Sequence, residues 1–269
     1  MDLHRFPGYT IARSVDAGGM ADIYVALNRR GERFIIRTPK TEYARNRPFL
    51  KGFSRGIDIL RRIDHPNIAP CVDHGTVGDK PFVVMPFFEA RTVRELIIAR
   101  DAFLSMNALA FIRQTAAALH AIHQARIIHL DIKPENLLVQ EDGHVILIDF
   151  DLALPATTLP LKMRNLSGTP FYLPPESLSA HLVDEQTDIF GFGVTSYEML
   201  TFHKPFEGHT VEESQRRHLA LDVPPTPMRT YNPNVPTALE SVIGKCLAKA
   251  PDKRYPATTL VLKDLEAIV

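Results

Sequence analysis

The period of the hydrophobic pattern changes near Thr92, and this change constrains the fold more than any other feature of the chain. Before it, apolar and polar residues alternate in YTIARSV, ADIYVAL and RFIIRT, with the turn residues NRRGE between the last two segments. Such alternation is typical of half-buried strands. IAPCVDHG and KPFVVMPFF have the composition of two more strands, and a helix is expected at about 49–63. The first third of the chain is therefore predicted to hold about five strands and one helix.

From Thr92 onward, the apolar residues follow the period of a helix. MNALAFIRQTAAALHAIHQA places them at i, i+3, i+4 and i+7, which is the pattern of an amphipathic helix. Later helices are expected at 186–201, 210–219, 236–248 and 256–268. The fold is therefore predicted to be α+β, with a small β-rich lobe joined to a larger helical lobe. Ligands often bind between two such parts.

Charge and cysteine content exclude several classes of function. The chain has 31 Lys and Arg residues and 31 Asp and Glu residues, so no positively charged surface is indicated and we expect no nucleic-acid partner. Cys71 and Cys246 match no metal-binding spacing and suit a reducing compartment. The N-terminus MDLHRFPGYT lacks the pattern of a signal peptide, and no apolar run approaches the length of a membrane span. We expect a soluble, cytoplasmic chain without a membrane segment.

The fragment HLDIKPENLLV, at 129–139, carries side chains suited to phosphoryl transfer. This reaction needs positioned reactants, divalent cations and a carboxylate that accepts the proton of the attacking hydroxyl. Asp131 would accept the proton, and Lys133 would stabilise the transferred phosphoryl group. Asn136 would bind a metal ion through its amide oxygen.

A second fragment, IDFD at 148–151, begins nine residues after the first ends. Its Asp149 ends the apolar strand VILI and would supply the main carboxylate to Mg²⁺, which prefers oxygen ligands. For any single residue of the two fragments, a helix cap or an ordinary turn is the simpler interpretation. The ordered set of Asp131, Lys133, Asn136 and Asp149 favours the catalytic interpretation.

With these two fragments and several further motifs, the chain resembles the eukaryotic-like (Hanks-type) Ser/Thr protein kinase family, particularly its bacterial branch. The resemblance runs from about Tyr9 to about Leu265. HPNI matches the turn after the N-lobe helix, VVMPFF the strand into the hinge, GTPFYLPPE the end of the activation segment, and TDIFGFGVTSYEML the helix that carries Asp188. The resemblance implies a bilobal protein kinase fold in one domain, 1–269, with the N-lobe at about 1–86, the hinge at about 86–91 and the C-lobe at about 92–269.

The resemblance also implies ligands and partners. These are ATP, bound with Mg²⁺, and a protein substrate or a regulated protein partner of unknown identity. The nucleotide-binding residues that it implies are Gly18, Gly19, Arg37, Met85 and Phe87. A buried ion pair of the family maps onto Glu176 and Arg254.

The chain departs from the family in the loop that covers the nucleotide. The family has G-x-G-x-x-G, whose glycines let backbone N–H groups approach the phosphates. Here Asp16 stands at the first glycine, Gly18 at the second and Ala21 at the third. Asp16 places a negative charge near the triphosphate, so we expect weakened nucleotide binding.

Four further departures concern charged residues of the active site. Arg37 stands where the family has the strand lysine of V-A-I-K, and Gly56 stands where the N-lobe helix has the glutamate that holds this lysine. The ion pair of the family is thus missing on both sides. Leu130 replaces the arginine that pairs with a phosphorylated loop. Asp151 replaces the glycine after Asp149-Phe150, where it would either recruit metal or repel phosphate.

Two functions remain open from the sequence. The first is a pseudokinase that binds ATP with Mg²⁺, has weak or absent phosphotransfer, and serves in signalling or as a scaffold. The second is an active but divergent Ser/Thr kinase that uses Asp131 as the base and Arg37 in place of the lysine. Arg37, Gly56 and Asp151 favour the first function, whereas the intact set in the two fragments favours the second.

Overall fold

The computed structural model describes residues 6–15, 19–164 and 168–268. Its contacts divide the chain into two compact units. The N-terminal unit comprises Met1–Glu89 together with Asp149–Ala153, and the C-terminal unit comprises Ala90–Ile148 together with Leu154–Val269. Asp149 and Asp151 thus belong to the same unit as Arg37, although they are more than a hundred residues further along the chain.

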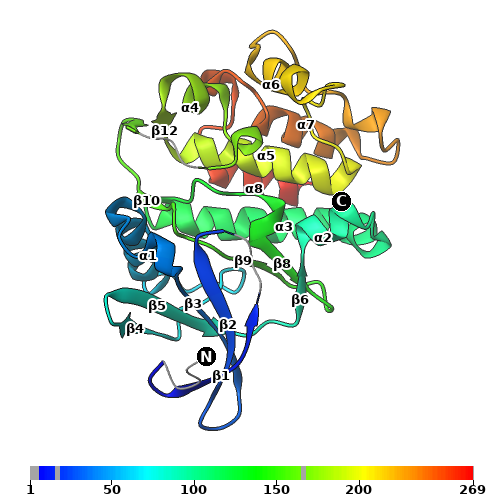
Figure 1. Cartoon of the computed structure of the whole chain (residues 1–269). Coiled ribbons are helices and arrows are strands. Elements are labelled where there is room, and N and C mark those ends of the chain that lie inside the picture. The colour runs from blue at the N-terminus through cyan, green and yellow to red at the C-terminus, as the bar shows by residue number, and fades with distance from the viewer. Residues whose placement is uncertain (1–5, 16–18, 165–167, 269) are drawn as a thin grey trace. The chain divides into compact units, whose positions relative to one another are not determined.

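The N-terminal unit is built on a five-stranded antiparallel sheet (Figure 1). The strands lie in the order β1-β2-β3-β5-β4. Their bounds are β1 Tyr9–Val15, β2 Ala21–Asn28, β3 Arg33–Pro39, β4 Asp73–Val77 and β5 Lys80–Pro86. Alternate residues of these strands, such as Tyr24, Ile36 and Val84, are buried in one apolar cluster. The alternation seen in the sequence therefore marks the buried face of this sheet, as predicted.

One main helix, α1 (Arg47–Leu60), packs against β5 in the same unit. Asn46 caps its N-terminus by accepting a hydrogen bond from the backbone N–H of Phe49 at 3.2 Å. The strand predicted from Ile68 is wrong at its start, because β4 begins only at Asp73. The preceding segment contains Pro70, which has no N–H to donate to a strand partner.

The C-terminal unit is mainly helical (Figure 1). Helix α5 is its centre: nearly all its residues are buried, and it packs against both α3 and α7. The helices are α2 Val93–Ile98, α3 Ala102–Gln124, α4 Pro175–Ala180, α5 Glu185–Thr201, α6 Val211–Leu219, α7 Thr237–Cys246 and α8 Thr258–Glu266. The four late helices predicted from the sequence correspond to α5, α6, α7 and α8, with bounds that differ by at most two residues.

Short strands place the two sequence fragments within this unit. The bounds are β6 Ala90–Thr92, β7 Ile127–Ile128, β8 Leu137–Gln140, β9 Val145–Leu147, β10 Leu154–Pro155, β11 Leu161–Lys162 and β12 Leu182–Val183. HLDIKPEN forms the loop between β7 and β8, and β9 leads directly to Asp149. A sheet-bearing unit with one main helix and a second, helical unit confirm the predicted α+β class. Among the helices of the described residues, none is long and apolar enough to cross a membrane.

Candidate active site

The loop after β7 is held by one buried carboxylate, that of Asp188 on α5. Its Oδ2 accepts the backbone N–H of His129 and its Oδ1 accepts that of Leu130, both at 2.7 Å. Oδ2 also lies 2.9 Å from Nε2 of His123. Leu130 is buried and has a positive φ of 67°, a conformation that is unfavourable for a branched side chain. Asp188 therefore holds the loop in a backbone shape that its own sequence would not favour.

Within this loop, the two residues predicted for catalysis, Asp131 and Lys133, are linked to each other and to the predicted metal ligand Asn136. The Nζ of Lys133 lies 2.8 Å from Oδ2 of Asp131, and it also donates to the hydroxyl of Thr169 at 3.1 Å. The amide nitrogen of Asn136 donates to both the backbone oxygen and Oδ2 of Asp131, each at 2.8 Å. Because the amide nitrogen makes both bonds, they leave the amide oxygen of Asn136, the atom that a cation would take, unused.

In the N-terminal unit, Arg37 binds the two carboxylates of the IDFD fragment. Its Nη2 lies 3.1 Å from Oδ2 of Asp149 and 3.1 Å from Oδ2 of Asp151. Only 12% of the Arg37 side chain is exposed, and its guanidinium carbon lies 5.9 Å from the centre of the Phe53 ring. Burial by itself lowers the pKa of Arg37, but the charges of Asp149 and Asp151 outweigh burial and raise this pKa above its usual value. Arg37 is thus a permanently charged partner of both aspartates.

The backbone of the same fragment lies directly against helix α1. A Cβ atom added to Gly56 would be 2.7 Å from the carbonyl oxygen of Phe150, and one added to Gly52 would be 2.8 Å from that of Asp151. Nε of Arg55, between the two glycines, donates to the carbonyl oxygen of Ala153 at 2.5 Å. Gly56, which the sequence presents only as a missing glutamate, is therefore the position at which the helix leaves room for this backbone.

The remaining residues that the resemblance assigns to the nucleotide belong to the N-terminal unit. Gly19 is exposed and has a φ of 101°, which is accessible to glycine but strained for other residues. Met85 is buried and pairs with Ile35 across β5 and β3. The ring of Phe87 lies 4.7 Å from the guanidinium carbon of Arg33. Gly18, like Asp16, lies outside the described residues.

Two side chains, one in each unit, carry oxygen atoms that suit a hard cation such as Mg²⁺. Asp149 has 31% of its side chain exposed, and Asn136 contributes an amide oxygen. Carboxylate and amide oxygens are the protein ligands that Mg²⁺ takes, usually together with water and phosphate oxygens. The described residues contain no group of three or more His, Cys, Asp or Glu that would hold a metal without such additional ligands. Asp149 in the N-terminal unit and Asn136 in the C-terminal unit thus each carry, taken singly, the oxygen chemistry of a Mg²⁺ ligand.

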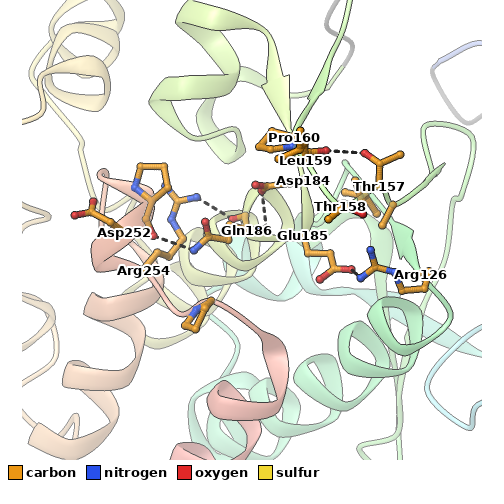
Figure 2. A pocket seen from close by; sticks show the side chains of 14 residues that line it. Arg126, Thr157, Thr158, Leu159, Pro160, Asp184, Glu185, Gln186, Asp252 and Arg254 are labelled. Carbon is orange, nitrogen blue, oxygen red and sulfur yellow. Dashed lines mark hydrogen bonds and ion pairs between the residues drawn. The ribbon is translucent and has the colours of Figure 1, made fainter.

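A pocket of about 500 Å³ lies in the C-terminal unit beside the N-terminus of α5 (Figure 2). Thr157 and Thr158 line it, and Arg126 forms an ion pair with Glu185 there at 2.9 Å. The hydroxyl of Thr157 donates to the backbone oxygen of Leu159 at 2.6 Å. The residues predicted for catalysis, nucleotide and metal do not line this pocket.

The predicted ion pair between Glu176 and Arg254 is present in this unit. Nη1 of Arg254 lies 2.8 Å from Oε1 of Glu176, and it also donates to the backbone oxygen of Gln186 at 2.9 Å. The second of these bonds is visible at the edge of the pocket in Figure 2.

A sheet-bearing unit that carries an arginine–aspartate site, and a helical unit that carries the Asp131 loop, define a protein kinase-like domain. The chain matches the family described as protein kinase domain over residues 9–265, and it belongs to that family. This match confirms the predicted bilobal protein kinase fold.

Bacterial relatives give the branch of the family. The chain is 32% identical over 262 residues to the serine/threonine-protein kinase PrkC of Bacillus subtilis, covering 96% of this chain and 39% of PrkC. It is 30% identical over 262 residues to PknL of Mycobacterium tuberculosis, covering 97% of this chain and 65% of PknL. The chain thus spans about two fifths of the length of PrkC and slightly less than two thirds of PknL. The resemblance to the bacterial Hanks-type Ser/Thr kinases is confirmed.

Three interactions of the site are not predicted by the sequence: Arg37 with Asp149, Arg37 with Asp151, and Lys133 with Thr169. Asp151 was interpreted only as a metal-recruiting or phosphate-repelling group, yet its carboxylate binds Arg37. Thr169 was part of a recognised motif, but nothing in the sequence indicated that its hydroxyl accepts from Lys133. All three interactions join residues far apart in the chain, so the local pattern carries no signal for them.

Proposed function

We propose that this domain binds ATP together with Mg²⁺ and that its phosphotransfer to protein hydroxyls is weak or absent. The observation that carries the weak-transfer part of the proposal is the ion pair between Arg37 and Asp149, 3.1 Å apart. Asp149 is the carboxylate that the family uses for the metal ion, so a bound cation has to share it with a positive charge that is already in place. Metal binding is therefore opposed by like-charge repulsion, which is strong at a partly buried site.

Each residue has a role in this proposal. Arg37 would bind the phosphates of the nucleotide, and Asp149 and Asn136 would supply oxygen ligands to Mg²⁺. The ion would neutralise charge on the phosphates when bound. In the family's chemistry the nucleotide lies beneath a glycine-rich loop, and here the negative charge of Asp16 would weaken its binding. A role in signalling or as a scaffold, through a protein partner that responds to the bound nucleotide, follows from binding without efficient turnover.

A second candidate is an active, divergent Ser/Thr kinase. The observation that favours it is the linked set of Asp131, Lys133 and Asn136, with contacts of 2.8 Å within the loop. Asp131 has only 11% of its side chain exposed and is held by both neighbours, so it is oriented as a proton acceptor would need to be.

Thermal unfolding tests the binding proposal. The protein is unfolded with ATP and Mg²⁺, with ATP alone and with Mg²⁺ alone, and Asp149→Ala is compared with the exposed control Asp58→Asn. A ligand that binds only the folded state adds about 2.7 kcal/mol at a hundredfold excess over its Kd. We expect a shift only with ATP and Mg²⁺ together, and we expect Asp149→Ala to abolish it. An equal shift with ATP alone, or an unaffected Asp149→Ala variant, contradicts the proposal.

Transfer of radiolabel from ATP to a generic basic protein separates the two candidates. Slow or undetectable transfer by the unmodified chain supports the first. Brisk transfer that is lost in Asp131→Ala, while nucleotide binding persists, supports the second and overturns the weak-transfer proposal.

A further inference from the structure

The strand arginine needs an anionic partner that remains available when Asp149 serves a metal ion. In the family this partner is a glutamate on the N-lobe helix, which this chain replaces with Gly56. Arg37 instead contacts Asp149 and Asp151 equally, with Nη2 3.1 Å from one oxygen of each. Because Asp149 is the metal carboxylate of the proposed function, Asp151 is the one of these two carboxylates that can keep Arg37 in position throughout.

The backbone of Asp151 is fixed by helix α1. Its carbonyl oxygen lies 2.8 Å from where a Cβ of Gly52 would be, and the adjoining carbonyl of Phe150 lies 2.7 Å from the corresponding point at Gly56. Its N–H donates to Oδ1 of Asp149 at 3.3 Å, and the segment ends at Ala153, whose carbonyl accepts from Arg55. A side chain carried on such a well-packed backbone is held at a defined position relative to the strand.

The two glycines and the aspartate therefore form one arrangement. The family pattern has a carboxylate on the helix and a glycine after Asp-Phe, and this chain has glycine on the helix and a carboxylate after Asp149-Phe150. These two positions are in contact, since a Cβ on Gly56 would lie 3.4 Å from the backbone nitrogen of Asp151. Relative to the family, the carboxylate is carried by residue 151 instead of by the helix. It still reaches the guanidinium of Arg37 on β3.

We propose that Asp151 is the positioning residue that holds Arg37 for nucleotide binding, in the place of the helix glutamate of the family. This inference rests on the proposed function for its role toward ATP, but the coupling of Asp151 to Arg37 is a property of the unliganded protein. It assigns Gly52 and Gly56 the task of admitting the backbone of residues 150–151 against α1. In this proposal, the carboxylate of Asp151 compensates for the absence of the glutamate from the N-lobe helix.

The first test uses the unliganded protein and a double-mutant cycle of Arg37→Gln with Asp151→Asn. Both changes keep a polar side chain and remove the charge. We expect non-additivity equivalent to about a tenfold change in the folding equilibrium constant, because either single change already breaks the pair. Asp58→Asn on the exposed side of α1 serves as the control, and its effect should add to that of Arg37→Gln. An additive Arg37–Asp151 cycle overturns the proposal.

A spectroscopic measurement distinguishes positioning from general stabilisation. The guanidinium signals of Arg37 in ¹⁵N-edited spectra are assigned by their loss in Arg37→Lys. We expect Asp151→Asn to increase the exchange of these guanidinium protons with water at least tenfold, and Asp58→Asn to leave it unchanged. Unchanged exchange in Asp151→Asn overturns the proposal.

The third test measures the Kd of adenylyl imidodiphosphate in the presence of Mg²⁺. If Asp151 positions Arg37, Asp151→Asn weakens binding about tenfold, and the Arg37→Gln, Asp151→Asn double variant binds no more weakly than Arg37→Gln alone. If Asp151 instead repels the triphosphate, Asp151→Asn tightens binding, and this outcome overturns the proposal. If the unmodified protein binds no nucleotide, the proposed function fails, and the cycle and the exchange measurement decide whether Asp151 holds Arg37.

Discussion

The guanidinium of Arg254 is completely buried and pairs with the carboxylate of Glu176, with Nη1 2.8 Å from Oε1. Nε donates to the backbone oxygen of Ala248 and Nη1 to that of Gln186, each at 2.9 Å. One side chain thus ties the first turn of α4 to the start of α5 and to the loop after α7. The energetics of such a buried charge depend on all of these acceptors being present together.

We predict that Arg254→Ala destabilises the protein by about 3–5 kcal/mol, because it leaves a partly buried carboxylate and several backbone oxygens without their donor. Equilibrium denaturation in urea measures the change. Arg126→Ala is the matched control, since the Arg126–Glu185 distance of 2.9 Å is close to the 2.8 Å of the Arg254–Glu176 pair, but 59% of the Arg126 side chain is exposed. That variant should lose less than about 1 kcal/mol. An Arg254→Ala protein with unchanged stability shows that the pair is not a stabilising element.

A second prediction concerns Asp188, which accepts hydrogen bonds from the backbone of His129 and Leu130. Asp188→Asn replaces one acceptor oxygen with a donor, so one of these two buried N–H groups loses its partner. We expect a loss of about 2–3 kcal/mol in unfolding free energy. Amides of residues 129–131 should also exchange faster with deuterated solvent. The exposed Asp222→Asn is the control, and equal exchange in the two variants contradicts the proposed role of Asp188.

The strands and helices could be read from the sequence because burial imposes a period on it. The apolar residues of ADIYVAL include the buried Tyr24, Val25 and Ala26 of β2. The continuous apolar run of VILI follows from the burial of all three residues of β9. The start of β4 was misplaced because IAPCVDHG has suitable apolar residues, whereas Pro70 prevents regular pairing before Asp73.

The active-site contacts likewise divide into those that the sequence predicts and those that it does not. The loop residues Asp131, Lys133 and Asn136 were identifiable because their spacing within one turn-rich segment brings them together locally. The partners of Arg37 were not, because Asp149 and Asp151 reach it from more than a hundred residues away. The sequence shows glycine at position 56, where the family has glutamate. The packing of the carbonyl oxygen of Phe150 against Gly56 is a property of the folded chain alone.

A third prediction is a dependence of stability on pH through His218. Its Nε2 donates to the carbonyl of Leu173 at 2.7 Å, and its ring packs against those of Phe190 and Phe206. Burial lowers the pKa of His218 below the ordinary 6.5, and the charge of Lys249 lowers it further. As pH falls below 6.5, the unfolded chain takes up a proton that the folded chain does not, so stability decreases.

His218→Gln isolates this contribution because it retains a side-chain donor and removes the titration. Denaturation midpoints are measured between pH 7.5 and pH 5. We expect the stability advantage of the unmodified protein over His218→Gln to shrink as pH falls, with a slope of at most about 1.4 kcal/mol per pH unit. The exposed His209→Gln is the control. A constant difference between the unmodified protein and His218→Gln across this range contradicts the prediction.

The last prediction concerns the two glycines of α1. Replacing glycine by alanine within a helix ordinarily stabilises a protein by about 0.5–1 kcal/mol, because glycine loses more backbone entropy on folding. Gly244 on α7 has nothing within 4 Å of the position of an added Cβ, so Gly244→Ala should show this gain. Gly56→Ala should lose stability instead, because its Cβ would lie 2.7 Å from the carbonyl oxygen of Phe150, which belongs to the backbone.

The same contact determines what happens when the missing glutamate is restored. Gly56→Glu adds a Cβ at the same place, so it displaces residues 149–153 before its carboxylate can reach Arg37. We expect Gly56→Ala and Gly56→Glu to speed deuterium exchange in residues 149–153 and to weaken binding of ATP with Mg²⁺, whether or not Arg37→Lys is also present. Gly244→Ala should leave exchange in residues 149–153 unchanged. The double variant Gly56→Glu, Arg37→Lys could instead bind ATP more tightly than either single variant and leave residues 149–153 protected from exchange. That outcome would show that the backbone accommodates the new side chain and that Gly56 has no packing role of its own.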